Sequence, residues 1–277
     1  MQARVNRWTD CLGIGLSFFL WAGLSSSAWA YLPPSQYLVK NWVKQHAGAK
    51  TIRLKTKITG LREDGSPSAV HFSAWTLYST ESKKLKSWAV TDSGSELYAV
   101  EKDVSHLSLP TVLFFESDLK LVMQALADKQ IPVRSESTLL EFKTEEERQA
   151  AEQEFLARWN GGFAWVIGNQ ESREEESPQL WIQKDSFLPV RLRFEDQAFE
   201  DVQISGYQLV RDFIYPRSLT LKSKYSGASL LEEVQEIKVN LDAAALKKNL
   251  KPGFSDLGQA QPGELKKLIQ TYYQVLR

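Results

Sequence analysis

The sequence predicts an α+β fold made mainly of antiparallel strands. From residue 51 onward, short segments rich in β-branched and aromatic residues follow one another, separated by turn residues such as those in REDGSPS. In several segments apolar and polar residues alternate, as they do from Leu188 to Phe194, which indicates strands with one buried face. A few other segments have apolar residues at helical spacing. Helices are therefore expected to contribute to covering that face.

The strands are expected to form two antiparallel series. The first covers residues 51–60, 69–80, 85–91 and 96–102 and has the pattern of a meander. The second starts at residue 163 and comprises FAWVIGN, LWIQ, LPVRLRF, DVQISGYQLV, YPRSLTLKSKY and LLEEVQEIKV. In the last segment Val234 and Ile237 fall on opposite sides of a regular strand. This predicts either a β-bulge or a strand that is buried on both faces.

Three helices are expected from apolar residues at helical spacing alone. The first begins at Ser35 and ends near Gly48. The second covers residues 118–129, with Ser117 as its N-cap. The last follows Pro262 and has an apolar side made of Leu265, Leu268, Ile269, Tyr272 and Val275.

A fourth helix is expected between these, on the basis of a capping box. In Thr144-Glu145-Glu146-Glu147 the threonine hydroxyl and the third-position carboxylate can satisfy each other's free backbone amides. The helix should run to about Trp159, where Gly161-Gly162 stops it.

Residues 1–30 have the pattern of a secretory signal peptide. Two arginines precede an apolar run from Leu12 to Leu24, and small residues follow as far as Ala30. Cleavage is expected after Ala30, leaving residues 31–277 as a single domain of a size common among extended β folds. The only cysteine, Cys11, lies in the predicted signal peptide, so the exported chain is expected to fold without disulfides.

The residue types do not indicate catalysis. Lysine and arginine together number 34, as do aspartate and glutamate, so no global positive field is expected to attract nucleic acid. His46, His71 and His106 lack the spacing of metal ligands, and neither a G-x-S-x-G turn nor a phosphate-binding glycine loop occurs. The sequence therefore favours a non-enzyme without metal or cofactor, with an unrecognised hydrolase as the least favoured alternative.

Two arrangements explain the apolar strand faces equally well. A curved sheet could pack against the helices in a filled α+β core, or it could wrap them as an incomplete barrel with an apolar cavity. A packed core and a lined cavity use the same residue types, so composition leaves both arrangements open.

Three consecutive stretches, LWIQKDSFLPVRLRF, DVQISGYQLVRDFIYPRSLTL and EEVQEIKVNLD, resemble the C-terminal half of the LolA/LolB superfamily of envelope lipoprotein carriers. The resemblance covers residues 163–240 well and residues 35–102 loosely. It implies an incomplete half-barrel of about ten or eleven antiparallel strands wrapped around lid helices, with an apolar cavity between them. It also implies a monomeric, non-catalytic carrier or chaperone in the periplasm. Such a protein takes acyl chains of a lipoprotein or lipid from an inner-membrane donor to an outer-membrane acceptor.

The candidate cavity residues follow from this resemblance together with the strand pattern. They are apolar side chains expected on the inner face of the sheet: Leu54, Phe72, Trp75, Trp165, Leu188, Val190, Leu192, Phe194 and Leu221. The alternative function is an envelope structural or interaction protein that has a filled core and binds no ligand.

Overall fold

The computed structural model describes residues 33–134, 154–168, 177–196, 198–223, 227, 229–241 and 249–277. The predicted signal peptide and its cleavage site lie outside the described residues, as does the predicted capping box at residues 144–147. Within the described ranges, no helix has the length and apolar character needed to cross a membrane.

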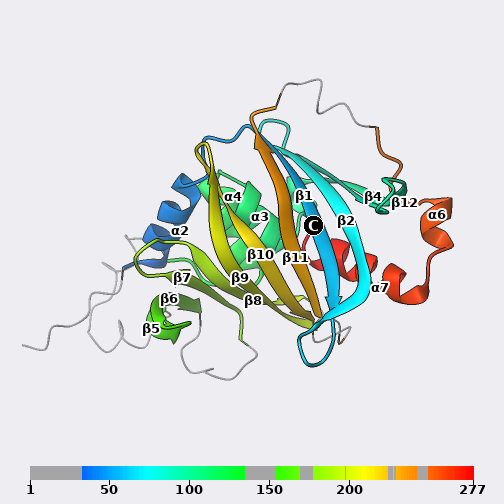
Figure 1. Ribbon diagram of the computed structural model, residues 1–277. Coiled ribbons are helices and arrows are strands. Elements are labelled where there is room, and N and C mark those ends of the chain that lie inside the picture. The colour runs from blue at the N-terminus through cyan, green and yellow to red at the C-terminus, as the bar shows by residue number, and fades with distance from the viewer. Residues whose placement is uncertain are drawn as a thin grey trace, which may run out of the picture. The chain divides into compact units, whose positions relative to one another are not determined.

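A single antiparallel sheet of twelve strands dominates the described residues (Figure 1). The strand order is β12-β4-β3-β2-β1-β11-β10-β9-β8-β7-β6-β5, so the sheet is open, with β12 at one edge and β5 at the other. This open, curved sheet with its helices is the predicted incomplete barrel. The strands are β1 (Thr51–Leu61), β2 (Pro67–Ser79), β3 (Lys84–Val90), β4 (Glu96–Asp103), β5 (Glu154–Trp159), β6 (Gly162–Gly168), β7 (Gln179–Gln183), β8 (Pro189–Asp196), β9 (Ala198–Val210), β10 (Phe213–Ser223), β11 (Ser229–Val239) and β12 (Gly253–Phe254).

The strand order follows from two meanders that meet at one seam. Strands β1 to β4 pair in sequence order, and so do β5 to β11. β1 then pairs with β11, which places Ile52 opposite Val239. Both predicted strand series are confirmed, and the seam between β1 and β11 joins them into one sheet.

The predicted bulge in β11 is also confirmed. Neighbouring residues of β1 lie opposite Glu236 and Val234, so Gln235 has no partner on β1. The extra residue brings Val234 and Ile237 onto the same side of the strand, because it reverses the alternation once.

Helices α2 (Ser35–Lys44), α4 (Leu119–Asp128) and α7 (Gly263–Val275) confirm the three helices predicted from apolar spacing. Together with α3 (Leu109–Phe115), which the sequence did not predict, they lie on one side of the sheet (Figure 1). The Ser108 side chain accepts a hydrogen bond from the backbone amide of Thr111 and so caps α3. The described residues also contain two short elements, the 3-10 turn η1 (Val104–His106) and helix α6 (Asp256–Gln259).

The helix predicted to end at Trp159 is wrong in its last part, because Glu154–Trp159 forms strand β5. β5 pairs with β6 through the two-residue turn Asn160-Gly161. Both turn residues have positive φ, 44° and 82°, which is the geometry that Asn-Gly favours in type I′ hairpins. Gly161 therefore belongs to a hairpin turn and does not stop a helix. β5 and the short β12 bring the number of strands to twelve.

The main hydrophobic core lies between the helices and the sheet face that they cover, which we call the inner face. Phe115 of α3 packs on Tyr215 of β10, with ring centroids 5.5 Å apart. Tyr272 of α7 packs on Phe72 of β2, with centroids 5.6 Å apart. Such aromatic pairs contribute beyond the area that they bury. They attach two separate helices to two distant parts of the same face.

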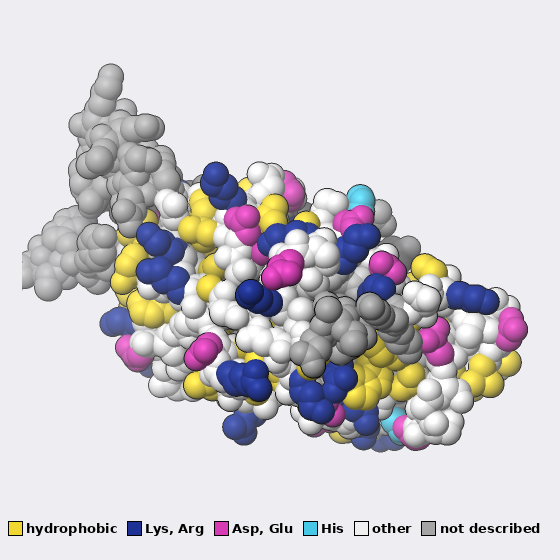
Figure 2. Space-filling model, turned by 90° about the horizontal axis from the view of Figure 1, so that it is seen from above, with side chains coloured by type: hydrophobic (Ala, Val, Ile, Leu, Met, Phe, Trp, Pro, Cys, Tyr) yellow, Lys and Arg dark blue, Asp and Glu magenta, His cyan; other side chains and the backbone are white. Residues whose placement is uncertain are grey.

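The opposite face, which we call the outer face, carries a smaller hydrophobic cluster on β2, β3 and β4. Its members are Leu77, Trp88, Val90 and Ala99, with Trp75, Leu241 and Leu250 packed against them. The surface seen in Figure 2 has lysine and arginine side chains interspersed with aspartate and glutamate, in line with the balanced charge of the sequence.

Candidate functional site

A row of fully buried aliphatic side chains crosses the inner face of six neighbouring strands. Residues directly opposite one another in antiparallel strands contact each other on one face of the sheet. From β6 to β11 the row consists of Ile167, Leu180, Leu192, Val202, Leu221 and Leu230. Two predicted cavity residues, Leu192 and Leu221, are therefore parts of one continuous apolar row.

A second row on the inner face contains a carboxylate. It crosses β2, β1, β11, β10 and β9 through Phe72, Ile58, Glu232, Leu219 and Ile204, all of them buried. The four neighbours of Glu232 in this row are apolar. A fully buried acid among them requires a partner, because an unpaired buried charge is strongly unfavourable.

Six of the nine predicted cavity residues share the inner face. Leu54, Trp165 and Phe194 are buried, and strand alternation puts them on the same side as Ile58, Ile167 and Leu192 respectively. With Phe72, Leu192 and Leu221, they form the set that the structure brings together.

Trp75 does not belong to this set. It is three residues from Phe72 along β2, and an odd separation reverses the side of a strand. On the outer face it lies opposite Lys55 and Trp88. Its half-buried ring stacks on Trp88 and lies 5.4 Å from the guanidinium carbon of Arg53, so it packs in the outer cluster and not in the inner core.

Leu188 and Val190 also depart from the expected alternation, and both are half-buried. Leu188 precedes β8, and its carbonyl accepts a hydrogen bond of 2.8 Å from the amide of Gln183. The register between β7 and β8 shifts at Val190, which has no partner on β7. Val190 instead lines a pocket of about 500 Å³ beside the turn Asn160-Gly161.

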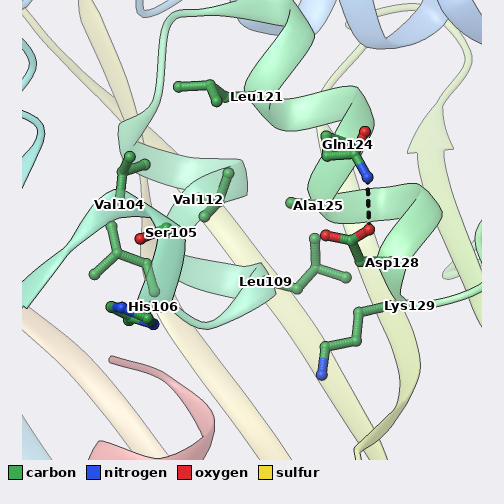
Figure 3. Close-up of a pocket in the computed structure, with 11 residues that line it drawn as sticks. Val104, Ser105, His106, Leu109, Val112, Leu121, Gln124, Ala125, Asp128 and Lys129 are labelled. Carbon is green, nitrogen blue, oxygen red and sulfur yellow. Dashed lines mark hydrogen bonds between the residues drawn. The ribbon is translucent and has the colours of Figure 1, made fainter.

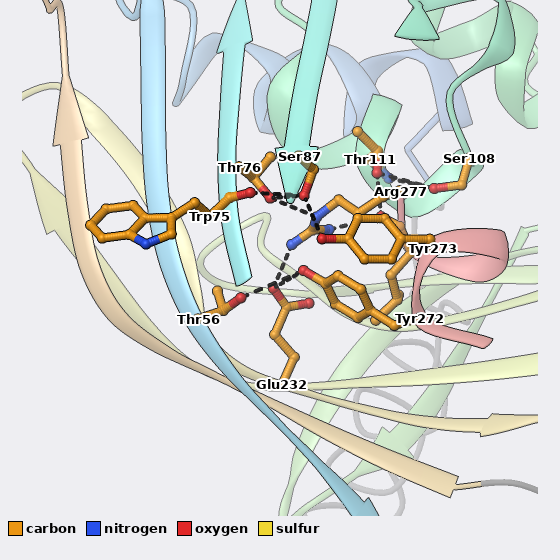
Figure 4. A network of polar contacts seen from close by, with 11 residues as sticks. Thr56, Trp75, Thr76, Ser87, Ser108, Thr111, Glu232, Tyr272, Tyr273 and Arg277 are labelled. Carbon is orange, nitrogen blue, oxygen red and sulfur yellow. Dashed lines mark hydrogen bonds and ion pairs between the residues drawn. The ribbon is translucent and has the colours of Figure 1, made fainter. Parts of the chain in front are cut away.

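Arg277 is the partner of Glu232, and both side chains are fully buried (Figure 4). Nη2 of Arg277 donates to Oε1 of Glu232, and its Nε donates to Thr76 Oγ1 at 3.2 Å. The Tyr272 hydroxyl donates to the same carboxylate oxygen at 3.3 Å. Thr56 Oγ1 lies 3.5 Å from the Tyr272 hydroxyl. β1, β2, β11 and the C-terminal helix region thus meet at one polar point.

Burial dominates the chemistry of this network. It raises the pKa of the Glu232 carboxyl above its ordinary value, and the charge of Arg277 offsets only part of that rise. Among the described residues, Glu232 Oε2 and the Tyr215 hydroxyl have no hydrogen-bond partner. A buried ion pair contributes little net stability compared with apolar residues of similar size. A buried arginine–glutamate pair kept inside an apolar row is therefore a candidate functional feature.

A second buried carboxylate, Glu116, follows α3. It accepts hydrogen bonds from the Tyr78 hydroxyl at 2.7 Å, from Lys83 Nζ at 2.6 Å and from the Asp118 amide at 2.8 Å. The backbone carbonyl of Glu116 lies 2.7 Å from Nε2 of His46. Burial lowers the pKa of His46 to about 4, so the ring is neutral at pH 7 and donates from Nε2.

A groove of about 520 Å³ lies between η1, α3 and α4 (Figure 3). Its volume is within the range of small-molecule pockets. Leu109 and Val112 line it from α3, whereas Phe115 of the same helix packs toward the sheet. The other lining residues are Val104, Ser105, His106, Leu107, Leu121, Gln124, Ala125, Asp128 and Lys129. The groove is therefore separated from the inner face by one short helix.

The described residues include no group of three His, Cys, Asp or Glu side chains that could hold a metal ion. The sequence patterns did not point to Glu232, Arg277 or Glu116. The only sequence signal for one of them is strand alternation, which places Glu232 on the same side as Leu230 and Val234.

No family model matches the chain, and no curated protein matches it. Solved structures are similar over most of its length. A LolA superfamily protein from Nitrosomonas europaea is 9% identical, with a TM-score of 0.47, and the match covers 78% of this chain and 98% of that one. An outer membrane lipoprotein-sorting protein domain from Vibrio parahaemolyticus is 11% identical, with 76% and 95% covered and a TM-score of 0.43. A DUF1329 family protein from Desulfovibrio piger is 11% identical, with 77% and 98% covered and a TM-score of 0.42.

Proposed function

We propose that this protein is a non-catalytic periplasmic carrier or chaperone that shields acyl chains of a lipoprotein or lipid between its sheet and its helices. The observation that carries the proposal is the pair of rows on the inner face, one of them entirely apolar and the other apolar except for Glu232. The strands are joined to one another by their own pairing. Displacement of α3 and α7 would break the contact between Arg277 and Glu232 and expose the apolar residues of both rows, while that pairing stays in place. In this role the protein would receive cargo from an inner-membrane donor and pass it to an outer-membrane acceptor.

The energetics support such a role. Each methylene group moved from water into an apolar site gains about 0.8 kcal/mol, so one acyl chain supplies a large driving force. Displacing the helices and ordering the chain reduce that gain. The remaining affinity should rise steadily with chain length.

The groove between η1, α3 and α4 offers a point of entry for an acyl chain, which supports the proposal. Leu109, Val112 and Leu121 in its lining offer a first contact for an acyl chain, and α3 packs on the inner face from the other side. We propose that cargo enters where α3 and α4 meet.

One observation favours the alternative of an envelope interaction protein with a filled core. Leu192 and Leu221 are fully buried by the protein's own side chains, so no solvent-accessible space borders them in this state. A direct binding experiment separates the two functions.

Replacing Leu192 with phenylalanine is expected to lower the affinity for a fluorescent fatty-acyl probe, because the larger ring takes space in the first apolar row. Overpacking should also lower the free energy of unfolding by about 1–3 kcal/mol. Probe titration and urea unfolding measure the two effects. Leu209→Phe is the matched control, because Leu209 is 68% exposed, and it should change neither quantity.

Wild-type protein should also retain hydrophobic mass in native mass spectrometry after gentle purification from its own envelope. Empty protein in repeated preparations, together with absent probe binding, would reject the carrier function and support the filled core. Probe binding that Leu192→Phe leaves unchanged would place the bound chain away from this row.

A further inference from the structure

β5 is the last strand of the sheet, and in the part of the chain that the structure describes it pairs with β6 alone. The two-residue turn fixes which of its backbone groups are free. Trp159 and Gly162 close the turn as a hydrogen-bonded pair, so every second residue backward from Trp159 also points its amide and carbonyl toward β6. The remaining residues, Glu154, Leu156 and Arg158, point theirs away from the sheet.

Two large apolar side chains beside this edge are exposed. Leu156 is 37% exposed and Phe163 of β6 is 48% exposed, and both lie on the same side of the hairpin. The guanidinium carbon of Arg158 lies 6.0 Å from the centre of the Phe163 ring. β5 contains no proline, lysine or described bulge, and its two charged residues, Glu154 and Arg158, have opposite signs.

We propose that β5 pairs antiparallel with β5 of a second copy of this chain. Symmetric pairing about Leu156 uses all three outward-pointing residues. Leu156 then lies opposite Leu156 of the second copy, and Glu154 lies opposite Arg158 in both directions. The contact is isologous, as in most homodimers, because each copy contributes the same patch.

The register is selected by hydrogen bonds and by charge together. Sliding the strands by one hydrogen-bonded pair in either direction leaves fewer pairs in place and puts a charged residue opposite Leu156. The Glu154 carboxylate already accepts a hydrogen bond from the Ser35 amide at 3.3 Å and lies 3.8 Å from Arg134 Nη1. Arg158 of the second copy would add another cation beside this acid, and opposite charges across strands are favourable.

This proposal replaces the expectation of a monomer and does not depend on acyl binding. Analytical ultracentrifugation of the full chain over a wide concentration range tests it. The wild type should show a concentration-dependent dimer. Leu156→Lys and Arg158→Glu should each weaken the dimer at least tenfold, the second by facing carboxylates against each other. Leu209→Lys, at an exposed position of β9, is the matched control and should leave the dimer unchanged.

Cross-linking provides a second readout that does not rely on a destabilising variant. In a Cys11→Ser background, Leu156→Cys puts the two thiols on the symmetry axis, so a disulfide-linked dimer should form faster than it does with Leu209→Cys. A chain that stays monomeric at every concentration would overturn the proposal. A dimer that survives both Leu156→Lys and Arg158→Glu would overturn it as well.

Discussion

Replacing Arg277 with methionine is expected to lower the free energy of unfolding by about 3–5 kcal/mol. The arginine side chain is fully buried and provides the only cation that hydrogen-bonds Glu232 among the described residues. Its removal would leave an uncompensated charge inside an apolar row. Urea unfolding followed by tryptophan fluorescence measures the loss.

Two further variants show whether burial is the cause. Arg53→Met breaks an ion pair on the outer face, where Arg53 Nη2 lies 3.1 Å from Glu236 Oε1 and both side chains are partly exposed. Its expected cost is below about 1 kcal/mol. Combining Arg277→Met with Glu232→Leu should recover most of the stability, because the unpaired charge is then absent. If Arg277→Met lowered the free energy of unfolding no more than Arg53→Met does, the pair of Arg277 and Glu232 could not be buried away from water as described.

Lowering the pH from 7 to 4.5 is expected to remove about 2–3 kcal/mol of stability through His46 alone. The unfolded chain protonates this histidine near its ordinary pKa of 6.5, whereas burial lowers the folded value to about 4. Between these two pH values the unfolded state binds more protons than the folded state. The contribution of His46 is therefore complete above pH 7 and is lost as the pH falls through this window.

His46→Gln is the matched variant, because glutamine keeps an N–H donor for the Glu116 carbonyl and does not titrate. Carboxylates elsewhere protonate in both proteins, so the difference between the two unfolding curves isolates His46. Glu116, Lys83 and Tyr78 surround the same point and remain in both. Parallel stability curves from pH 7 to 4.5 would contradict a buried neutral histidine.

The strands were predictable because alternation reports directly which side chains face a core. The bulge in β11 was predictable for the same reason, because Val234 and Ile237 can lie on one side of the strand only if an extra residue stands between them. The predictions for Trp75 and for residues 154–159 were wrong because the local strand signals were not applied there. Trp75 is an odd number of residues from Phe72, so alternation itself places it on the outer face. A helix was predicted up to Trp159, although Asn160-Gly161 is a typical hairpin turn and indicates a strand before it.

The polar network was beyond the reach of local patterns. Glu232 and Glu233 form a charged doublet of a common kind, and only the pairing of Glu232 with Ile58 and Leu219 shows which of the two is buried. Arg277 has no distinctive sequence context, because its burial depends on how α7 docks on the sheet. Contacts between residues far apart in sequence decide both positions.

The seam between β1 and β11 sets the order in which the chain can fold. Ile52 and Val239 meet only when most of the chain is available, and closing so long a loop costs more entropy than forming the hairpins within each meander. The two meanders can therefore form early, and they join into one sheet late. Before β11 pairs with it, β1 is an unpaired edge strand. Arg53, Lys55 and Lys57 alternate along it, and such charges discourage an edge from aggregating with other nascent chains.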